Sequence, residues 1–130
     1  MYAFGWTVNL KQSINLVHKY LKKSGIFIFS WHNPLMHCIK AEDNTYSIFR
    51  SYLDEATIDL TKANQAMQLK NWKLSSYINE LSSAGFKIDK LIEETDKDIL
   101  NKEHDFTLKY YSKHKAKLIN TSFIIKEIKL

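Results

Sequence analysis

Three side chains able to bind a metal ion lie close together in the sequence. His32, His37 and Cys38 fall within seven residues, and imidazole and thiolate groups are ordinary ligands of zinc. A structural zinc ion usually needs four ligands, and no second cluster follows at a matching distance along the chain. We therefore predict that the chain holds no metal.

Other combinations of reactive residues give only weak evidence for a catalytic site. Asp54 and Glu55 could supply a general base, although an exposed acidic pair is the commoner outcome. There is no Ser-His-Asp pattern, and the three glycines, at positions 5, 25 and 85, are too far apart to form a phosphate-binding loop. The residues alone therefore favour none of these common catalytic sites.

The positive charge of the chain comes almost entirely from lysine. Nineteen Lys and Arg residues stand against fourteen Asp and Glu, for a formal charge of +5, and Arg50 is the only arginine. Specific recognition of phosphates and bases relies on the bidentate guanidinium group, so nucleic-acid binding is disfavoured. The basic stretch Lys109–Lys117 could contact an acidic partner, but a solvated helix face is the simpler interpretation.

Length and composition indicate one small domain. The 130 residues suffice for one modest core, and 45% apolar with 25% charged residues is ordinary for a globular protein. No apolar run approaches the roughly 20 residues that cross a bilayer, and the first residues lack the pattern of a secretory signal. With Cys38 as the single cysteine, we expect a cytoplasmic protein with no disulfide and no membrane partner.

A helix followed by a buried strand is predicted near the N-terminus. Apolar residues recur at three- and four-residue steps from Asn9 to Leu21, and Asn9 has the capping-box spacing with Gln12. Gly25 is placed to end this helix. The apolar run Ile26–Trp31 then predicts a strand buried on both faces, with a polar loop at its carboxyl end, where ligands of open α/β sheets bind.

The middle of the chain is irregular. Within residues 39–71, Tyr46–Leu60 contains β-favouring residues, while Thr61–Leu69 fits either a short helix or a loop. We interpret this segment as an insertion.

Regular elements return in the second half. A helix is predicted over Lys73–Ala84, and the pair Gly85-Phe86 is typical of its ending. An edge strand over Lys87–Glu93, a basic connector and a last strand over Thr121–Ile128 follow. The order predicts an α/β fold, but three main strands make a thin sheet, so further sheet is expected beside the first strand.

Several segments, taken in order, form a recognisable series: Ala3–Thr7, Leu21–Gly25, Ile26–Pro34, Ser51–Glu55, Tyr77–Phe86 and Lys117–Lys126. They resemble the middle and end of class I S-adenosylmethionine-dependent methyltransferases that act on small molecules. That family has an aromatic-glycine-tryptophan loop after its fourth strand, a fifth strand running into Ser-Trp-x-x-Pro, and a helix ending in Ala-Gly-Phe. The chain departs from the family at Lys23-Ser24 and at Asn120, which concern turn geometry.

The resemblance implies a specific fold. Residues 1–130 would be one partial domain, the C-terminal half of a Rossmann-like methyltransferase sheet with strands five, six and antiparallel seven, and residues 39–71 a substrate-side insertion. Ile26–Trp31 would run parallel to Lys87–Glu93, with Phe123–Ile128 antiparallel between them. The family's fourth strand pairs with the free edge of Ile26–Trp31, so a chain without that strand is expected to self-associate there.

The resemblance also implies what is missing. The family holds its cofactor with a Gly-x-Gly-x-Gly loop after the first strand and an acidic residue that ends the second, and this sequence contains neither. S-adenosylmethionine is therefore expected in a full-length parent, and this chain alone should bind it poorly. The chain would be a methyltransferase fragment acting on a small-molecule acceptor, from a parent that continues upstream or from a truncated gene. A non-catalytic basic interaction module or relic is the alternative.

The resemblance places a substrate or cofactor pocket near the aromatic residues. The candidates for lining it are Tyr2, Phe4, Trp6, Trp31, His32, His37 and Trp72. Aromatic walls would give methyl transfer a dry, shaped cavity, although each of these rings could instead belong to the core. His32 matches a family loop in which substrate contact or proton transfer is plausible, with an ordinary loop histidine as the alternative. No catalytic base can be assigned.

Overall fold

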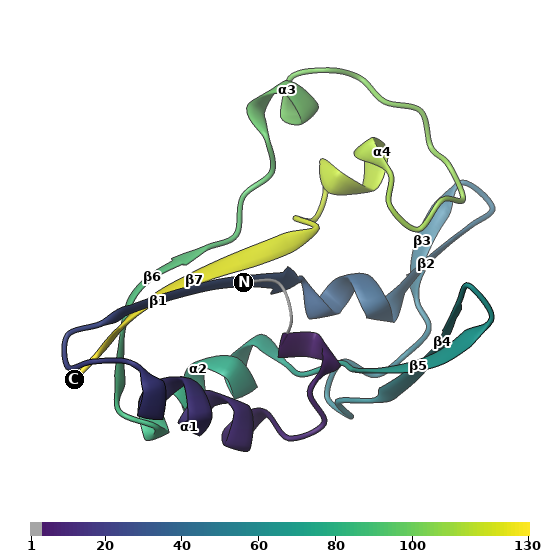
Figure 1. Cartoon of the computed structure of the whole chain (residues 1–130). Coiled ribbons are helices and arrows are strands. Elements are labelled where there is room, and N and C mark those ends of the chain that lie inside the picture. Colours follow the sequence, from purple (N-terminus) through teal and green to yellow (C-terminus); the bar gives the residue numbers. More distant parts are fainter. Residues whose placement is uncertain (1–3) are drawn as a thin grey trace.

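The computed structural model describes residues 4–130, with the side chain of Lys62 left out. Its elements follow one another along the chain as shown in Figure 1. They are η1 (Phe4–Trp6), α1 (Leu10–Tyr20), β1 (Ile26–His32), η2 (Pro34–Cys38), β2 (Ile39–Glu42), β3 (Thr45–Ile48), β4 (Thr57–Lys62), β5 (Gln65–Lys70), α2 (Leu74–Ser83), β6 (Phe86–Ile92), α3 (Lys97–Leu100), α4 (Lys113–Ala116) and β7 (Ser122–Lys129).

The central element is a three-stranded sheet in the order β1-β7-β6. The last strand, β7, pairs antiparallel with both neighbours: Phe123 lies opposite Trp31 of β1, and Ile125 lies opposite Leu91 of β6. Strands β1 and β6 are therefore parallel to each other across β7. This arrangement confirms the strand order and directions predicted from the sequence.

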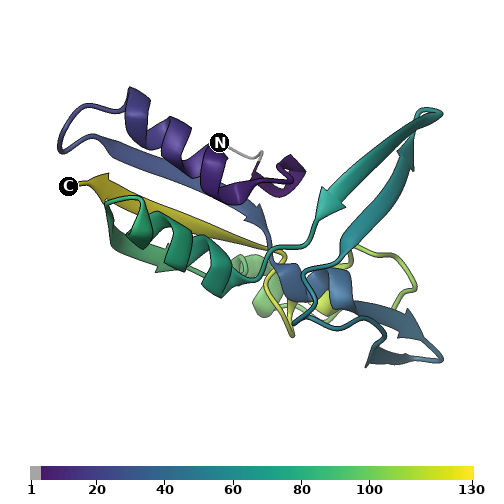
Figure 2. The ribbon, with the colours of Figure 1, turned by 90° about the horizontal axis from the view of Figure 1, so that it is seen from below.

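Both long helices cover the same face of this sheet, as Figures 1 and 2 show. Helix α1 begins as predicted, since Oδ1 of Asn9 accepts a hydrogen bond of 3.0 Å from the backbone N–H of Gln12. Helix α2 ends before Gly85, whose φ of +92° suits the left-handed region that glycine enters without strain. The core between helices and sheet contains Leu10, Ile14, Phe29, Tyr77, Leu81, Phe123 and Ile125.

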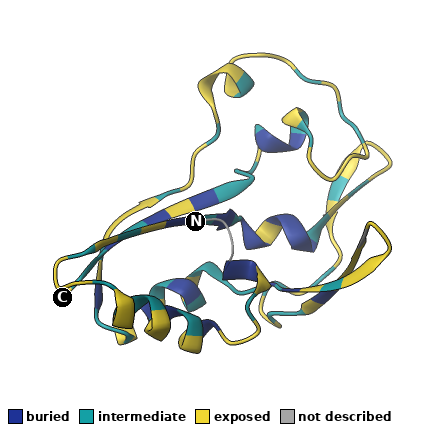
Figure 3. Cartoon of the chain, in the orientation of Figure 1, coloured by how far each residue is buried: buried dark blue, intermediate teal, exposed yellow. Residues whose placement is uncertain are grey.

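The opposite face of the sheet is largely open. Ile26 of β1 is 55% exposed and Ile124 of β7 is 37% exposed, and Figure 3 shows exposed residues along both strands. The prediction that the first strand is buried on both faces is therefore wrong for the described residues. A continuous apolar run carries no alternation that would tell one buried face from two.

The predicted insertion forms two β-hairpins that project beyond the carboxyl end of β1 (Figures 1 and 2). Strands β2 and β3 are joined by Asp43-Asn44, and β4 and β5 by Ala63-Asn64, with all four residues at positive φ. Two successive residues of this kind are typical of the type I′ hairpin turn. The helix and loop interpretations of Thr61–Leu69 are both wrong, because this segment belongs to the second hairpin.

Candidate functional site

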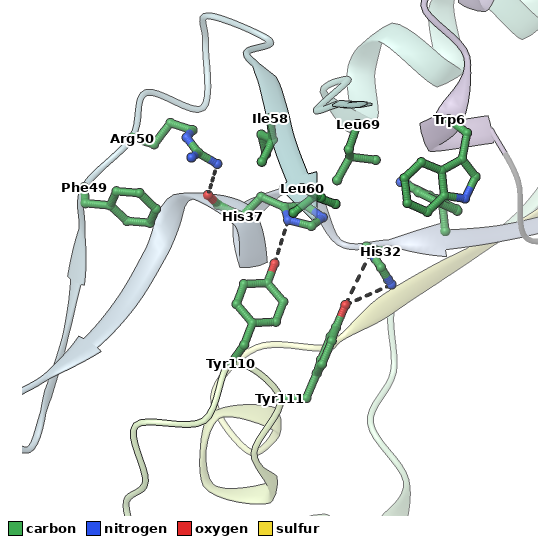
Figure 4. Close-up of a pocket in the computed structure, with 11 residues that line it drawn as sticks. Trp6, His32, His37, Phe49, Arg50, Ile58, Leu60, Leu69, Tyr110 and Tyr111 are labelled. Atoms are coloured by element: carbon green, nitrogen blue, oxygen red, sulfur yellow. Dashed lines mark hydrogen bonds between the residues drawn. The ribbon is translucent and has the colours of Figure 1, made fainter. Parts of the chain in front are cut away.

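A cavity of about 370 Å³ lies where the insertion meets the carboxyl end of β1. Its wall combines η1, the end of β1, η2, the segment after β3, the second hairpin and the segment before α4. Figure 4 shows the lining side chains converging from these elements. The lining residues are Trp6, Trp31, His32, His37, Phe49, Arg50, Ile58, Leu60, Leu69, Tyr110 and Tyr111. Most of them are aromatic or aliphatic, as is usual for a site that binds small organic molecules.

The short helix η2 fixes the position of His37. Asn33 caps this helix by accepting a hydrogen bond of 3.1 Å from the N–H of Leu35, and Pro34 occupies its first turn. The side-chain amide of Asn71, which follows the second hairpin, donates to the carbonyl of Pro34 at 3.1 Å. Asn33 and Asn71 are both buried, so these contacts tie the hairpin to the end of β1.

Two adjacent tyrosines reach the two histidines of the cavity (Figure 4). The hydroxyl of Tyr110 lies 2.7 Å from Nδ1 of His37, and the hydroxyl of Tyr111 lies 2.9 Å from Nε2 of His32. The centroids of the two imidazole rings are 5.3 Å apart. The result is a paired Tyr–His arrangement that closes one side of the cavity.

Both histidines are held in the neutral form. Burial lowers the pKa of His32. Burial, with smaller contributions from His32 and Arg50, lowers the pKa of His37 to about 4. Nε2 of His37 is buried and has no hydrogen-bond partner within residues 4–130, which also disfavours a charged ring. Near neutral pH the cavity therefore carries no histidine charge.

A buried lysine supports the tyrosine segment. Lys115 of α4 is only 2% exposed, and its ammonium group donates a hydrogen bond of 3.0 Å to the carbonyl of Tyr110. The same ammonium lies 5.0 Å from the ring centroid of Tyr110, within cation–π distance. Burial lowers the pKa of Lys115. Part of the basic stretch that the sequence left as a solvated helix face thus packs inside the molecule.

The structure separates the sequence candidates into three groups. Trp6, Trp31, His32 and His37 line the cavity together. Phe4 belongs to the hydrophobic core, 4% exposed and 4.9 Å from the ring of Phe29. Trp72 packs against the same core and donates from its indole nitrogen to the carbonyl of Thr7 at 3.0 Å. Tyr2 lies outside the described residues.

The acidic pair lies away from the cavity lining. Glu55 accepts hydrogen bonds from the backbone N–H of Lys73 at 3.2 Å and from the hydroxyl of Ser76 at 2.8 Å. It thereby caps α2, whose N-cap residue Lys73 makes no side-chain capping bond. Asp54 is exposed. Glu55 therefore has a structural role at the helix terminus.

Sequence reasoning missed Phe49, Arg50, the two tyrosines and the apolar residues of the second hairpin. Tyr110 and His37 are 73 residues apart, and Tyr111 and His32 are 79 apart, so no local spacing signals their contact. The hairpin had a weak signal, because Asn64 stands at a turn position between segments of alternating polarity.

Within residues 4–130 of the structure, no three His, Cys, Asp or Glu side chains come close enough together to hold a metal ion. In the same residues, no helix has the length and apolar character needed to cross a membrane.

The overall fold matches solved structures of proteins described as methyltransferases. One, from Listeria monocytogenes, is provisionally assigned as an S-adenosylmethionine-dependent methyltransferase; the TM-score is 0.74 at 19% sequence identity, covering 99% of this chain. Another, an S-adenosylmethionine-dependent methyltransferase from Mesorhizobium loti, matches with a TM-score of 0.71 at 19% identity, covering 98% of this chain. No protein-family profile and no curated protein matches the sequence.

The match covers only part of each neighbour. This chain spans 58% of the Listeria protein and 60% of the Mesorhizobium protein. It therefore has the fold of a large part of these methyltransferases, as the resemblance implied. At this level of identity the likeness concerns the fold alone.

Proposed function

We propose that this chain is the acceptor-side part of an S-adenosylmethionine-dependent methyltransferase that modifies a small molecule. The observation that carries the proposal is the aromatic cavity at the carboxyl end of β1, in a fold shared with methyltransferases over nearly the whole chain. In open α/β sheets, ligands bind beyond the carboxyl ends of the strands. The cavity would hold the methyl acceptor, and its walls would align the acceptor and exclude water.

The described residues do not fit a complete cofactor site. Gly5 is the glycine beside the cavity, and a Cβ atom placed on it would come within 1.8 Å of the indole of Trp31. The space above this glycine is thus filled by a tryptophan, which leaves no open cradle for a ligand. Among residues 4–130, no Asp or Glu lines the cavity to hold ribose hydroxyls. We therefore assign the cofactor site of the proposed enzyme to polypeptide outside these residues.

The first prediction concerns the cofactor. Titration calorimetry of the 130-residue chain with S-adenosylhomocysteine should give no saturable heat in the micromolar range, because a ligand enclosed on one side has too few placed partners. Saturable one-to-one binding would contradict this prediction and would require a cofactor site elsewhere in this chain.

The methyl transfer itself needs a separate assay. The natural polypeptide that contains these residues should transfer a labelled methyl group from S-adenosylmethionine to a small molecule, and substitution of cavity residues should reduce the transfer. A natural polypeptide that neither binds the cofactor nor transfers methyl groups would favour the non-catalytic interaction module.

The self-association predicted from the sequence concerns the sheet. Strand β1 lies at an edge of the described sheet. Ile26 of β1 and Ile124 of β7 are exposed on the open face of this sheet. Exposed apolar sheet surface of this kind favours pairing with a second copy. Multi-angle light scattering of the chain at high concentration should give a mass of at least two copies, and a uniform monomer would contradict the prediction.

A further inference from the structure

Among the described residues that line the cavity, Arg50 is the one permanently charged side chain. The other ten lining residues are aromatic, aliphatic or histidine, and His32 and His37 are neutral near pH 7 because their pKa values are lowered. None of the lining residues within the described part of the chain is acidic. The site therefore repels cations and attracts anions, and one guanidinium group compensates one negative charge.

Arg50 is held in place without being neutralised. Its Nη1 donates a hydrogen bond of 3.0 Å to the carbonyl of His37, and its guanidinium carbon lies 4.9 Å from the ring centroid of Phe49. It forms no ion pair within the described part of the chain. A guanidinium has five N–H donors in a planar fork that matches a carboxylate. Arg50 is thus preorganised and retains donors for a ligand.

The rest of the wall favours a flat ring system. Indole, phenyl and phenol rings come from Trp6, Trp31, Phe49, Tyr110 and Tyr111. A volume of about 370 Å³ is near the lower end of the range for small-molecule sites, which suits a ligand of one or two rings.

We propose that the cavity binds an aromatic monocarboxylate, with the ring between the aromatic walls and the carboxylate on Arg50. The proposal rests on the proposed function, since it names the substrate class of the same acceptor site. A doubly charged phosphate ester is disfavoured because the single guanidinium would leave one negative charge uncompensated in an apolar cavity.

Three probes that share one aromatic body test the charge preference. They are 3-phenylpropanoate, its neutral amide 3-phenylpropanamide and the cationic 3-phenylpropylamine. Binding to the 130-residue chain without cofactor can be followed by tryptophan fluorescence, because two of the three tryptophans line the cavity. The carboxylate should bind at least about 10-fold more tightly than the amide, since hydrogen bonds to a charged group contribute more than neutral ones. The amine should bind most weakly.

Nuclear magnetic resonance gives an independent measurement on the unaltered chain. Arg50 is the only arginine, so the spectrum contains a single arginine Nε–H signal. The carboxylate should shift this signal in proportion to occupancy, and the amide should shift it much less. Saturable carboxylate binding that leaves the signal unmoved would overturn the assignment to Arg50.

Substitution of Arg50 separates the contribution of its charge to probe affinity from the contribution of the apolar cavity wall. Arg50→Gln should reduce the preference for carboxylate over amide to within about 2-fold while the amide affinity stays near its original value. The matched control Lys109→Gln removes an exposed positive charge from a residue outside the cavity lining, and it should keep the preference. A preference that survives Arg50→Gln, an amide that binds as tightly as the carboxylate, or absence of binding by all three probes would overturn the proposal. Because no cofactor is present, these results are independent of the methyl-transfer assay.

Discussion

At pH 8, the Glu127→Gln variant should be more stable than the unaltered chain, by about 2–4 kcal/mol in its free energy of unfolding. Glu127 is fully buried in the central strand β7, between Phe27 of β1 and Ile88 of β6. Neither of its carboxyl oxygens has a hydrogen-bond partner within the described residues. Burial raises its pKa from 4.5 to about 8, so the folded chain holds this side chain protonated at neutral pH.

The direction of the pH dependence follows from that shift. Below pH 4.5 the carboxyl group is protonated in both states, and its contribution to stability is fully present. Between pH 4.5 and about 8 the unfolded chain releases the proton while the folded chain retains it, so stability falls as the pH rises. Glutamine has no proton to release. Its amide is still buried without partners, so the gain in the free energy of unfolding stays below the value that corresponds to the full pKa shift of Glu127.

Urea denaturation at pH 4 and at pH 8 measures the effect. The two proteins should differ little at pH 4 and clearly at pH 8. Glu94→Gln is the matched control, because Glu94 is exposed and its substitution should leave the pH dependence unchanged. A Glu127→Gln variant whose stability falls with pH as steeply as that of the unaltered chain would show that another group causes the dependence.

The sequence was informative where local pattern and family order agreed. The capping residue Asn9, the two long helices and the existence of the three strands were all predicted, because each depends on periodicity or on a turn residue at a defined place. The antiparallel position of β7 between β1 and β6 came from the resemblance alone. Periodicity does not report which strands become neighbours.

The site was only partly predictable, since it is assembled from distant segments. Trp6, Trp31, His32 and His37 were named as candidates, and the structure brings all four to one cavity. Arg50 was noted only as a lone arginine. Its position beside His37 depends on how the end of β3 folds back on η2, through the bond of 3.0 Å from the N–H of Phe49 to the carbonyl of Cys38. Such contacts are set by tertiary packing, which no spacing in the sequence reveals.

The sequence left open whether each tryptophan packs in the hydrophobic core or lines the cavity. For Trp31 and Trp6, a matched pair of substitutions can separate these two roles. Trp31 is 3% exposed and Trp6 is 43% exposed, although both line the cavity and their rings meet edge to face at 5.7 Å. Trp31→Ala should lower the free energy of unfolding by about 3–5 kcal/mol, because it leaves a void over Gly5 in a packed region. Trp6→Ala should lower it by about 1 kcal/mol, since much of that ring is already in water.

The comparison tests whether the cavity wall is part of the folding core. If Trp31 served only as a binding surface, the two substitutions would lower stability by similar amounts in urea denaturation. A much larger loss of stability in Trp31→Ala than in Trp6→Ala would mean that the packing that holds β1 against η1 also stabilises the cavity wall at Trp31. The wall at Trp6 would then be the partly solvated side of the cavity. A ligand ring could then gain contact at Trp6 without displacing core side chains. Probe affinity should accordingly fall in Trp6→Ala while the fold remains intact.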